Sequence, residues 1–168
     1  MYVEKTRREG LFLEKTEIFH SFMEKIKYFD RILDRQQSVP RYYGTELLLY
    51  SSEVDLLEAI GANEPITATE LARMKISTPS AISQIVKKLD GKNLLVKDTQ
   101  EGNRKNIYLR LSDEGRRIYG FSCRQQTRVY QAYMRELSDY TAEDIAKAAG
   151  LIDFLTEKYL EELNSLDM

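Results

Sequence analysis

Cysteine and histidine are almost absent from this 168-residue chain, which contains one of each, Cys123 and His20. A disulfide framework requires pairs of cysteines, and a zinc site of the usual type requires several Cys or His ligands, so we expect neither. The sequence also lacks a P-loop, a G-x-S-x-G nucleophile motif and a recognisable Ser/His/Asp set. With one histidine for proton transfer, the chain is expected not to be an enzyme and to hold no metal or other cofactor.

Long apolar segments are missing as well. No run of 18 or more apolar residues is present, so no membrane-spanning helix is expected. The first ten residues, MYVEKTRREG, are charged and lack the apolar segment of a signal peptide. We therefore expect a cytoplasmic protein without a membrane partner. The composition, 42% hydrophobic and 31% charged, and the length fit one domain with long helical arms.

The most informative stretch begins with a predicted helix after Ser77. Thr78 is a suitable N-cap, and Pro79 suits the first helical position because its missing N–H leaves no hydrogen bond unmade there. Apolar residues then recur at steps of three and four, at Ala81, Ile82, Ile85, Val86 and Leu89. The opposite face is polar, with Ser80, Ser83, Gln84, Lys87 and Lys88. Asn93 follows the helix, where a left-handed cap is expected.

A basic hairpin is predicted to follow this helix. Residues 94–97 and 107–111 have strand character and flank a polar tip that contains Gly102-Asn103 and the adjacent cations Arg104 and Lys105. A basic tip beside a helix in the major groove can reach the neighbouring minor groove. A polar-faced helix followed by such a hairpin is typical of a winged helix-turn-helix, a fold that reads DNA.

Two shorter helices are predicted before the polar-faced helix. The first covers residues 51–62, with Ser51 or Ser52 as N-cap and Gly61 at its end. The second follows a capping box formed by Thr67 and Glu70 and runs through Met74. Together with the later helix they give helix-turn-helix spacing, although a generic three-helix packing unit has the same pattern.

Charge is distributed unevenly along the chain. The net charge is −2, yet the segment from Arg73 to Arg110 holds nine basic and three acidic residues, a net charge of +6, and the remainder carries −8. One face of the protein can therefore attract phosphate while the rest keeps it soluble.

Long amphipathic helices are expected on both sides of this central region. Residues 11–36 carry an apolar stripe rich in Phe, and a break follows at Pro40 and Gly44. Ser112 is predicted to cap a helix that ends near Leu137, and a capping box at Thr141 starts a last one. These stripes exceed what a small winged helix can cover, so a two-fold homodimer is expected.

The run from Ser77 to Gly115 resembles the central part of MarR-family transcriptional regulators. The matching motifs are LDGKNLLVK at 89–97, NRK at 103–105 and LSDEG at 111–115. The chain departs from the family pattern at the wing, where Asn103 replaces an Asp and Lys97 and Lys105 replace arginines. These lysines keep the charge but lose the bidentate geometry of Arg.

The resemblance implies a mainly α fold with a small β-hairpin wing, a winged helix-turn-helix flanked by dimerisation helices. The implied organisation is an N-terminal dimerisation helix and connection over 11–44, a DNA-binding lobe over 45–111 and C-terminal dimerisation helices over 112–168. The implied function is that of a ligand-responsive repressor that binds a pseudo-palindromic operator as a homodimer, with recognition helices about 34 Å apart.

Site residues follow from the same resemblance. Gln84 is expected near adenine, Lys87 and Lys88 on phosphates, Arg104 in the minor groove and Lys105 on the backbone. The full predicted DNA-binding set is Thr78, Pro79, Ser80, Ser83, Gln84, Lys87, Lys88, Arg104, Lys105 and Asn106. A small-molecule effector cleft is implied near Phe22, Phe29, Tyr42, Tyr43, Tyr119 and Phe121, although core and dimer packing also accounts for these aromatics.

Other functions remain open at this point. A winged helix that has lost DNA binding and serves as a protein-interaction module is favoured by Asn103, by Lys97 and by the acidic remainder of the chain. A redox-responsive regulator using Cys123 is a further alternative, although no second cysteine is present to pair with it. Metal sensing is disfavoured by the shortage of His and Cys, except through Asp and Glu ligands.

Overall fold

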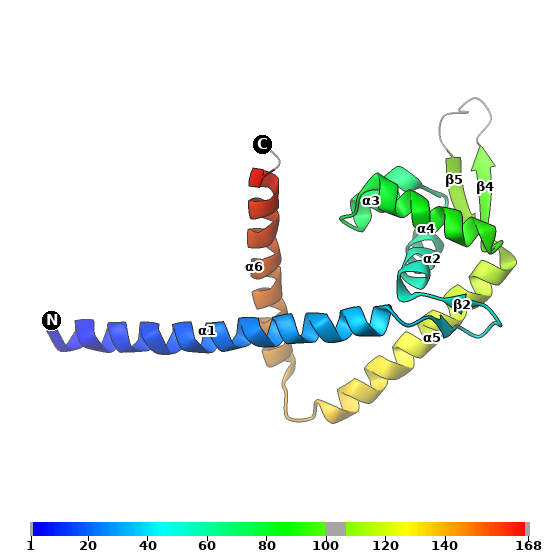
Figure 1. The fold of residues 1–168 in the computed structure, drawn as a ribbon. Coiled ribbons are helices and arrows are strands. Elements are labelled where there is room, and N and C mark those ends of the chain that lie inside the picture. Colours follow the sequence, from blue (N-terminus) through cyan, green and yellow to red (C-terminus); the bar gives the residue numbers. More distant parts are fainter. Residues whose placement is uncertain (1, 100–106, 167–168) are drawn as a thin grey trace. The chain divides into compact units, whose positions relative to one another are not determined.

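A computed structural model describes residues 2–99 and 107–166 of the chain. This part forms six helices and five short strands (Figure 1). Their bounds are α1 Tyr2–Gln37, β1 Arg41–Tyr42, β2 Leu48–Leu49, α2 Ser51–Asn63, β3 Ile66–Thr67, α3 Ala68–Met74, α4 Pro79–Gly91, β4 Leu95–Thr99, β5 Ile107–Leu111, α5 Asp113–Glu136 and α6 Ala142–Leu166. The chain divides into two compact units, Met1–Cys123 and Arg124–Met168. No helix in the described ranges is both long and apolar enough to cross a membrane.

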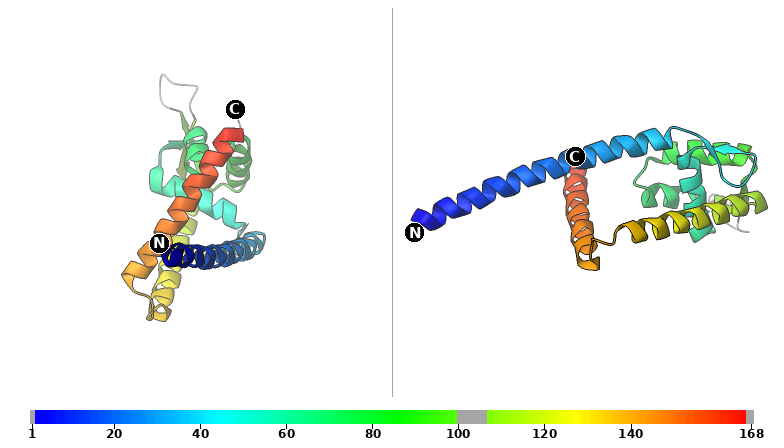
Figure 2. Two further views of the ribbon diagram at one scale, coloured as in Figure 1. Left: turned by 90° about the vertical axis from the view of Figure 1, so that its left-hand side faces the viewer. Right: turned by 90° about the horizontal axis from the view of Figure 1, so that it is seen from below.

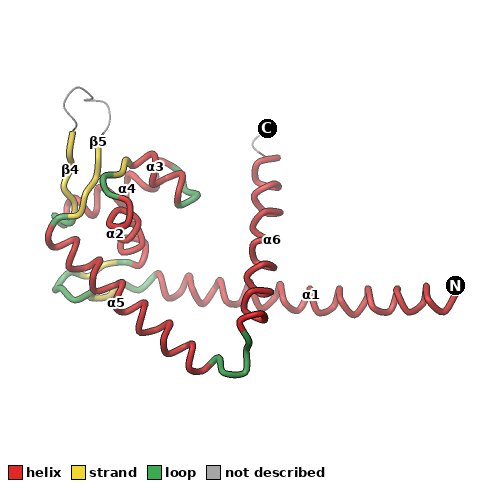
Figure 3. Tube along the Cα trace, turned by 180° about the vertical axis from the view of Figure 1, so that it is seen from behind, coloured by secondary structure: helices red, strands yellow, loops and turns green. Residues whose placement is uncertain are grey.

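The first unit contains a lobe built from α2, α3, α4 and a three-stranded sheet. The sheet has the order β3-β5-β4 and is antiparallel throughout (Figure 3). In its register Leu95 pairs with Leu111 and Thr99 with Ile107, while Ile66 pairs with Leu109. Strands β4 and β5 therefore form the predicted hairpin. Its tip, residues 100–106, lies outside the described residues.

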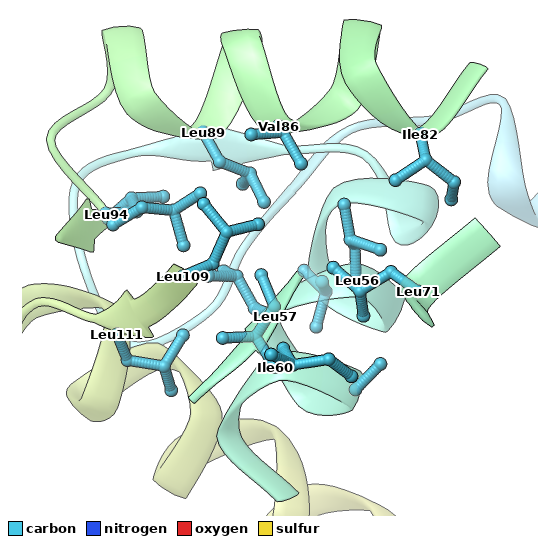
Figure 4. Close-up of a cluster of buried hydrophobic side chains, with 14 of the residues drawn as sticks. Leu56, Leu57, Ile60, Leu71, Ile82, Val86, Leu89, Leu94, Leu109 and Leu111 are labelled. Carbon is cyan, nitrogen blue, oxygen red and sulfur yellow. The ribbon is translucent and has the colours of Figure 1, made fainter. Parts of the chain in front are cut away.

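One hydrophobic core holds the lobe together. Ile82, Val86 and Leu89 point from α4 toward side chains of α2 and β5, among them Leu57 and Leu109 (Figure 4). All five are buried, in agreement with the apolar face predicted for this helix, whose other two members, Ala81 and Ile85, are half-buried. Full burial of one Leu or Ile side chain contributes about 1.5–3 kcal/mol, so this face fixes which side of α4 remains in solvent.

Helix starts follow the local capping signals. Thr67 Oγ1 accepts a hydrogen bond from the Glu70 amide at 3.3 Å, while the Glu70 carboxylate accepts one from the Thr67 amide at 2.8 Å. The Thr141–Asp144 pair repeats this arrangement at the start of α6. The Gly115 amide donates to Ser112 Oγ at 3.1 Å. These predicted starts are confirmed because each depends only on side chains within one helical turn.

Helix α2 was predicted over residues 51–62 and is observed over Ser51–Asn63, but the residues predicted to cap and end it were wrong. Its N-cap is Tyr50, not Ser51 or Ser52, and the Glu53 carboxylate accepts the Tyr50 amide at 2.9 Å. The helix continues past Gly61 to Asn63. A Cβ at Gly61 would lie 2.9 Å from a methyl carbon of Leu111 and 3.0 Å from the Tyr119 ring. Gly61 therefore provides room for close packing and does not end the helix.

Three further bounds differ from expectation. Helix α1 is unbroken from Tyr2 onward (Figure 2), although the sequence indicated a start near residue 11. A single internal glycine, Gly10, costs a helix only about 1 kcal/mol. The short β1–β2 hairpin was not predicted, because two-residue strands carry no detectable alternation of polar and apolar residues. Strand β4 runs over Leu95–Thr99 instead of residues 94–97.

The turn between α3 and α4 places Ile76 in a left-handed conformation, with φ of +47°. This conformation costs a non-glycine residue about 1–2 kcal/mol, and Ile76 recovers little by burial because it is 72% exposed. Ile76→Gly is therefore expected to raise the free energy of unfolding by roughly 0.5–1 kcal/mol, after allowance for the greater freedom of glycine in the unfolded chain. Urea denaturation measures this gain. Ile76→Ala is the matched control, and equal stability of the two variants would contradict the release of backbone strain.

Candidate nucleic-acid interface

The polar face of α4 lies in solvent as a direct result of core packing. Ile82, Val86 and Leu89 occupy the buried side of the helix. The residues on the opposite side are all exposed: Ser80, Ser83, Gln84, Lys87 and Lys88. Thr78 and Pro79, at the start of the helix, are exposed as well. The structure thus brings together seven of the ten residues predicted to bind DNA.

The first turns of α4 are held by two hydroxyl groups. Thr78 Oγ1 accepts the amide hydrogen of Ala81 at 3.2 Å, which confirms the predicted N-cap. Ser83 Oγ donates to the carbonyl oxygen of Pro79 at 2.7 Å. At the other end of the helix Asn93 has φ of +56°, and the Leu94 amide bonds back to the Leu89 carbonyl at 3.0 Å. The predicted left-handed cap at Asn93 is confirmed.

The lysines of this region fall into two groups. Lys92 Nζ lies 2.7 Å from Glu53 Oε1, and Lys97 Nζ lies 2.6 Å from Asp90 Oδ2. Lys87 and Lys88 make no ion pair with any residue in the described ranges. The net charge of +6 counted along the sequence already includes Asp90, so of these two ion pairs only that of Lys92 with Glu53, which lies outside the counted segment, reduces it, by one charge. The positive charge on α4 that remains available comes from Lys87 and Lys88.

Lys92 also fixes the position of α4. Its Nζ donates to both carboxylate oxygens of Glu53 and, at 3.0 Å, to the carbonyl oxygen of Leu48 in β2. Glu53 is only 2% exposed, and its second oxygen accepts the Tyr50 amide. The C-terminal end of α4 is therefore joined to the start of α2 by a buried ion pair. Sequence reasoning missed this role, because the two partners are 39 residues apart.

A second charged contact joins the sheet to α5. Glu64 accepts hydrogen bonds from the Leu111 amide, at 2.9 Å, and from the guanidinium of Arg116. Burial opposes ionisation of Glu64, yet these hydrogen bonds and the charge of Arg116 together lower its pKa. At pH values above the pKa that Glu64 has in the unfolded chain, this contact stabilises the lobe. The contribution is lost as the pH falls through the lower pKa of Glu64 in the folded state.

A groove between α3 and β5 adds residues that the sequence did not single out as site residues. Its volume is about 460 Å³, and it is lined by Thr67, Ala68, Thr69, Glu70, Arg73, Ile107 and Tyr108. Arg73 supplies a cation, and Thr69 and Tyr108 supply hydroxyl groups at the base of the wing. The positive charge of Arg73 was counted along the sequence, but only the fold places it beside β5.

The wing-tip residues predicted to contact DNA are Arg104, Lys105 and Asn106, and they lie outside the described residues together with Asn103. Their roles stay predictions. The adjoining strands carry a further charged pair, in which Arg110 Nε lies 3.9 Å from Asp98 Oδ2.

The six aromatics predicted to line an effector cleft occupy different environments. Tyr43 and Tyr119 pack against the core of the lobe. Phe121 packs against Gly44, where a Cβ would lie 2.6 Å from its ring. Phe22 is half-buried, whereas Phe29 is 59% exposed and Tyr42 63% exposed. The cleft itself stays a prediction.

Cys123 lies near this aromatic group and is half-buried. Its thiol interacts with Tyr119, and this neighbour is the main cause of the raised pKa of the Tyr119 phenol. Burial likewise raises the pKa of Tyr43. On the same side of α2, Ser122 Oγ donates to the Glu58 carboxylate at 2.5 Å.

Comparison with known proteins gives similarity to a curated sequence and to solved structures. No family model matches the chain. An uncharacterized HTH-type transcriptional regulator of Bacillus subtilis, YhjH, is 28% identical over 163 residues, which cover 95% of this chain and 91% of that protein.

Two solved structures have the same fold. FabT of Streptococcus pneumoniae, crystallised in complex with DNA, is 20% identical with a TM-score of 0.65 and covers 86% of this chain and 99% of its own. ZitR of Lactococcus lactis, a zinc-responsive MarR family member, is 14% identical with a TM-score of 0.65 over 84% of this chain and 99% of its own. These likenesses confirm the predicted fold class, and they bear out the resemblance noted in the sequence.

Proposed function

We propose that this chain, which has the fold of MarR-family regulators, is a sequence-specific DNA-binding transcriptional regulator. The observation that carries the proposal is the exposed polar face of α4, with Gln84, Lys87 and Lys88 directed away from the core. A helix of this kind beside a hairpin wing suits the major groove of DNA. The likeness to the Bacillus subtilis regulator, which extends over 95% of this chain, supports the same function.

Individual roles follow from the chemistry of each side chain. The Gln84 amide suits the N6 and N7 atoms of adenine, while Lys87 and Lys88 suit phosphates. Arg73, in the groove at the base of the wing, adds a backbone contact. Arg104 and Lys105 at the wing tip extend the contact to the minor groove and its backbone. Such a protein acts in the cytoplasm, where it meets chromosomal DNA.

The protein is proposed to act as a homodimer. Large apolar side chains are exposed on α1, including Ile18 at 62% and Phe29 at 59%. The second unit exposes others along α5 and α6: Val129, Tyr130, Tyr133, Met134, Ile145, Ile152, Phe154, Tyr159 and Leu163. Exposed apolar surface on this scale marks an interaction site, and a second copy covers it by two-fold symmetry. Residues 11–44 and 112–168 then serve as dimerisation arms around a reading lobe at 45–111.

The DNA binding of this protein is also proposed to be regulated by a small molecule. FabT was crystallised with DNA, and ZitR is described as zinc-responsive. For this chain we propose a ligand-responsive repressor whose effector binds near the aromatic residues around Tyr43 and Tyr119. A tyrosine phenol is protonated at neutral pH at its ordinary pKa, and burial of Tyr43 and the Cys123 neighbour of Tyr119 raise these two pKa values further.

Fluorescence anisotropy tests the DNA-binding function. The purified protein is titrated on the DNA upstream of its own gene and on scrambled DNA, over a range of salt concentrations. Tight binding to one sequence with a steep salt dependence is expected. Lys87→Ala and Lys88→Ala should each weaken binding on both DNAs and reduce the slope of log affinity against log salt by about 1. Lys147→Ala, on the exposed surface of α6, is the matched control and should leave the slope unchanged.

A different result points to the alternative functions. Equal, weak binding to both DNAs would require a genome-wide selection of bound fragments. A selection that recovers no enriched fragment would contradict the regulator and support a winged helix used for protein interaction. If oxidation abolishes DNA binding by the wild type but not by Cys123→Ser, the protein is a redox-responsive regulator that uses Cys123.

A further inference from the structure

Two hydroxyl groups of α4 are engaged inside the helix in opposite ways. Thr78 Oγ1 accepts the Ala81 amide hydrogen, so its own hydrogen remains available for an outside acceptor. Ser83 Oγ donates its hydrogen to the Pro79 carbonyl at 2.7 Å, a typical distance for such a bond, so only its lone pairs remain for an outside partner. Both residues are exposed on the face proposed to meet DNA.

From this difference, and resting on the proposed DNA-binding function, we infer that Ser83 reads bases as a hydrogen-bond acceptor. It therefore selects adenine or cytosine at one position in each half-site. In the major groove the amino groups are N6 of adenine and N4 of cytosine, whereas guanine and thymine present the carbonyl oxygens O6 and O4. The lone pairs of Ser83 attract an amino group and repel a carbonyl oxygen.

The same reasoning separates Ser83 from the backbone contacts. Phosphate oxygens only accept hydrogen bonds, so a serine whose hydrogen is already donated gains nothing from a phosphate. Thr78 has the complementary property, because its remaining hydrogen suits a phosphate oxygen or a carbonyl-bearing base. The hydrogen bond from Ser83 to the carbonyl four residues earlier is one that serine commonly forms in helices. A helix that keeps its conformation in the groove keeps this bond.

Gln84 completes the reading surface beside Ser83. Its amide makes no hydrogen bond within the described residues, so it keeps both a donor and an acceptor for one base. The two neighbouring residues thus read in different ways. Gln84 recognises one base by a donor–acceptor pair, while Ser83 distinguishes amino-bearing from carbonyl-bearing bases.

Selection of bound sequences from a random DNA library, followed by anisotropy, tests the inference. The wild-type protein is expected to require adenine or cytosine at a position where Ser83→Ala accepts any base. Replacing that adenine with purine, or that cytosine with 2-pyrimidinone, removes the amino group alone. The wild type should then lose about three- to tenfold in affinity, the range for one hydrogen bond, and Ser83→Ala should lose nothing comparable. Lys147→Ala, on the exposed surface of α6, should respond to the analogue as the wild type does.

Each contrary result has a distinct meaning. If Ser83→Ala and the wild type, both shown to be folded by circular dichroism, enrich the same sequence with the same discrimination, Ser83 does not read a base. If the position that depends on Ser83 is guanine or thymine, the hydroxyl acts as a donor and the inference is wrong. A wild-type protein that enriches no sequence would instead overturn the proposed function, and this inference with it.

Discussion

Gly115→Ala is expected to lower the free energy of unfolding by about 3 kcal/mol, more than most single substitutions in this protein. A Cβ at Gly115 would lie well inside van der Waals contact with the carbonyl oxygen of Leu94 and 3.4 Å from the Leu111 side chain. Backbone atoms have little freedom to withdraw, so either α5 or the start of β4 must shift. The Leu94 carbonyl also accepts the Ser112 amide at 3.0 Å, and this hydrogen bond would be strained.

Urea denaturation of the wild type and the variant measures this loss. Gly91→Ala is the matched control, because a Cβ at Gly91 meets nothing within 4 Å among the described residues. That change lies within α4 and should leave stability equal or raise it by up to about 1 kcal/mol. A Gly115→Ala protein within about 0.5 kcal/mol of the wild type would show that the close approach of α5 to β4 is not required.

Lys92→Met should cost about 2–3 kcal/mol of unfolding free energy. The change leaves the nearly buried Glu53 carboxylate without its cation and the Leu48 carbonyl without its donor. Loss of one partner of a buried ion pair typically costs about 3–5 kcal/mol, and the 29% exposure of the Lys92 side chain reduces that figure through solvent screening. Denaturant midpoints and the temperature of thermal unfolding both report the effect.

The cause of this loss can be checked by a second substitution. In a protein that carries Lys92→Met, the further change Glu53→Gln removes the unpaired charge but keeps an oxygen that can accept the Tyr50 amide. The double variant is therefore expected to recover part of the unfolding free energy that Lys92→Met loses. Lys97→Met, which breaks the exposed pair with Asp90, is the control and should change stability by about 0.5 kcal/mol or less. Equal effects of Lys92→Met and Lys97→Met would exclude a special role for the buried pair.

The parts of the fold that the sequence predicted well depend on near neighbours. Thr67, Thr78 and Ser112 each bond to an amide three residues later, so a short window of sequence contains the whole interaction. The alternation of buried and exposed residues along α4 is local in the same sense, because it follows from the helical period alone.

Features that depend on distant residues were missed or misread. Gly61 looked like a helix end, because the side chains of Leu111 and Tyr119 that require a glycine there lie about 50 residues further along the chain or more. Lys92 looked like part of a basic surface, because its partner Glu53 comes from another helix. The exposure of the polar face of α4 was predicted from the helical spacing of its residues and is confirmed. The ion pair that holds α4 in place had no signal in the sequence.

The strand order β3-β5-β4 leaves two edges of the sheet unpaired, and both are poor templates for another chain. Strand β3 is two residues long and follows Pro65, which has no N–H to donate. Strand β4 carries Lys97 and Asp98 on its exposed edge. Short or charged edges resist edge-to-edge pairing between sheets. The lobe can therefore expose the edges of this sheet to solvent without seeding edge-to-edge aggregation.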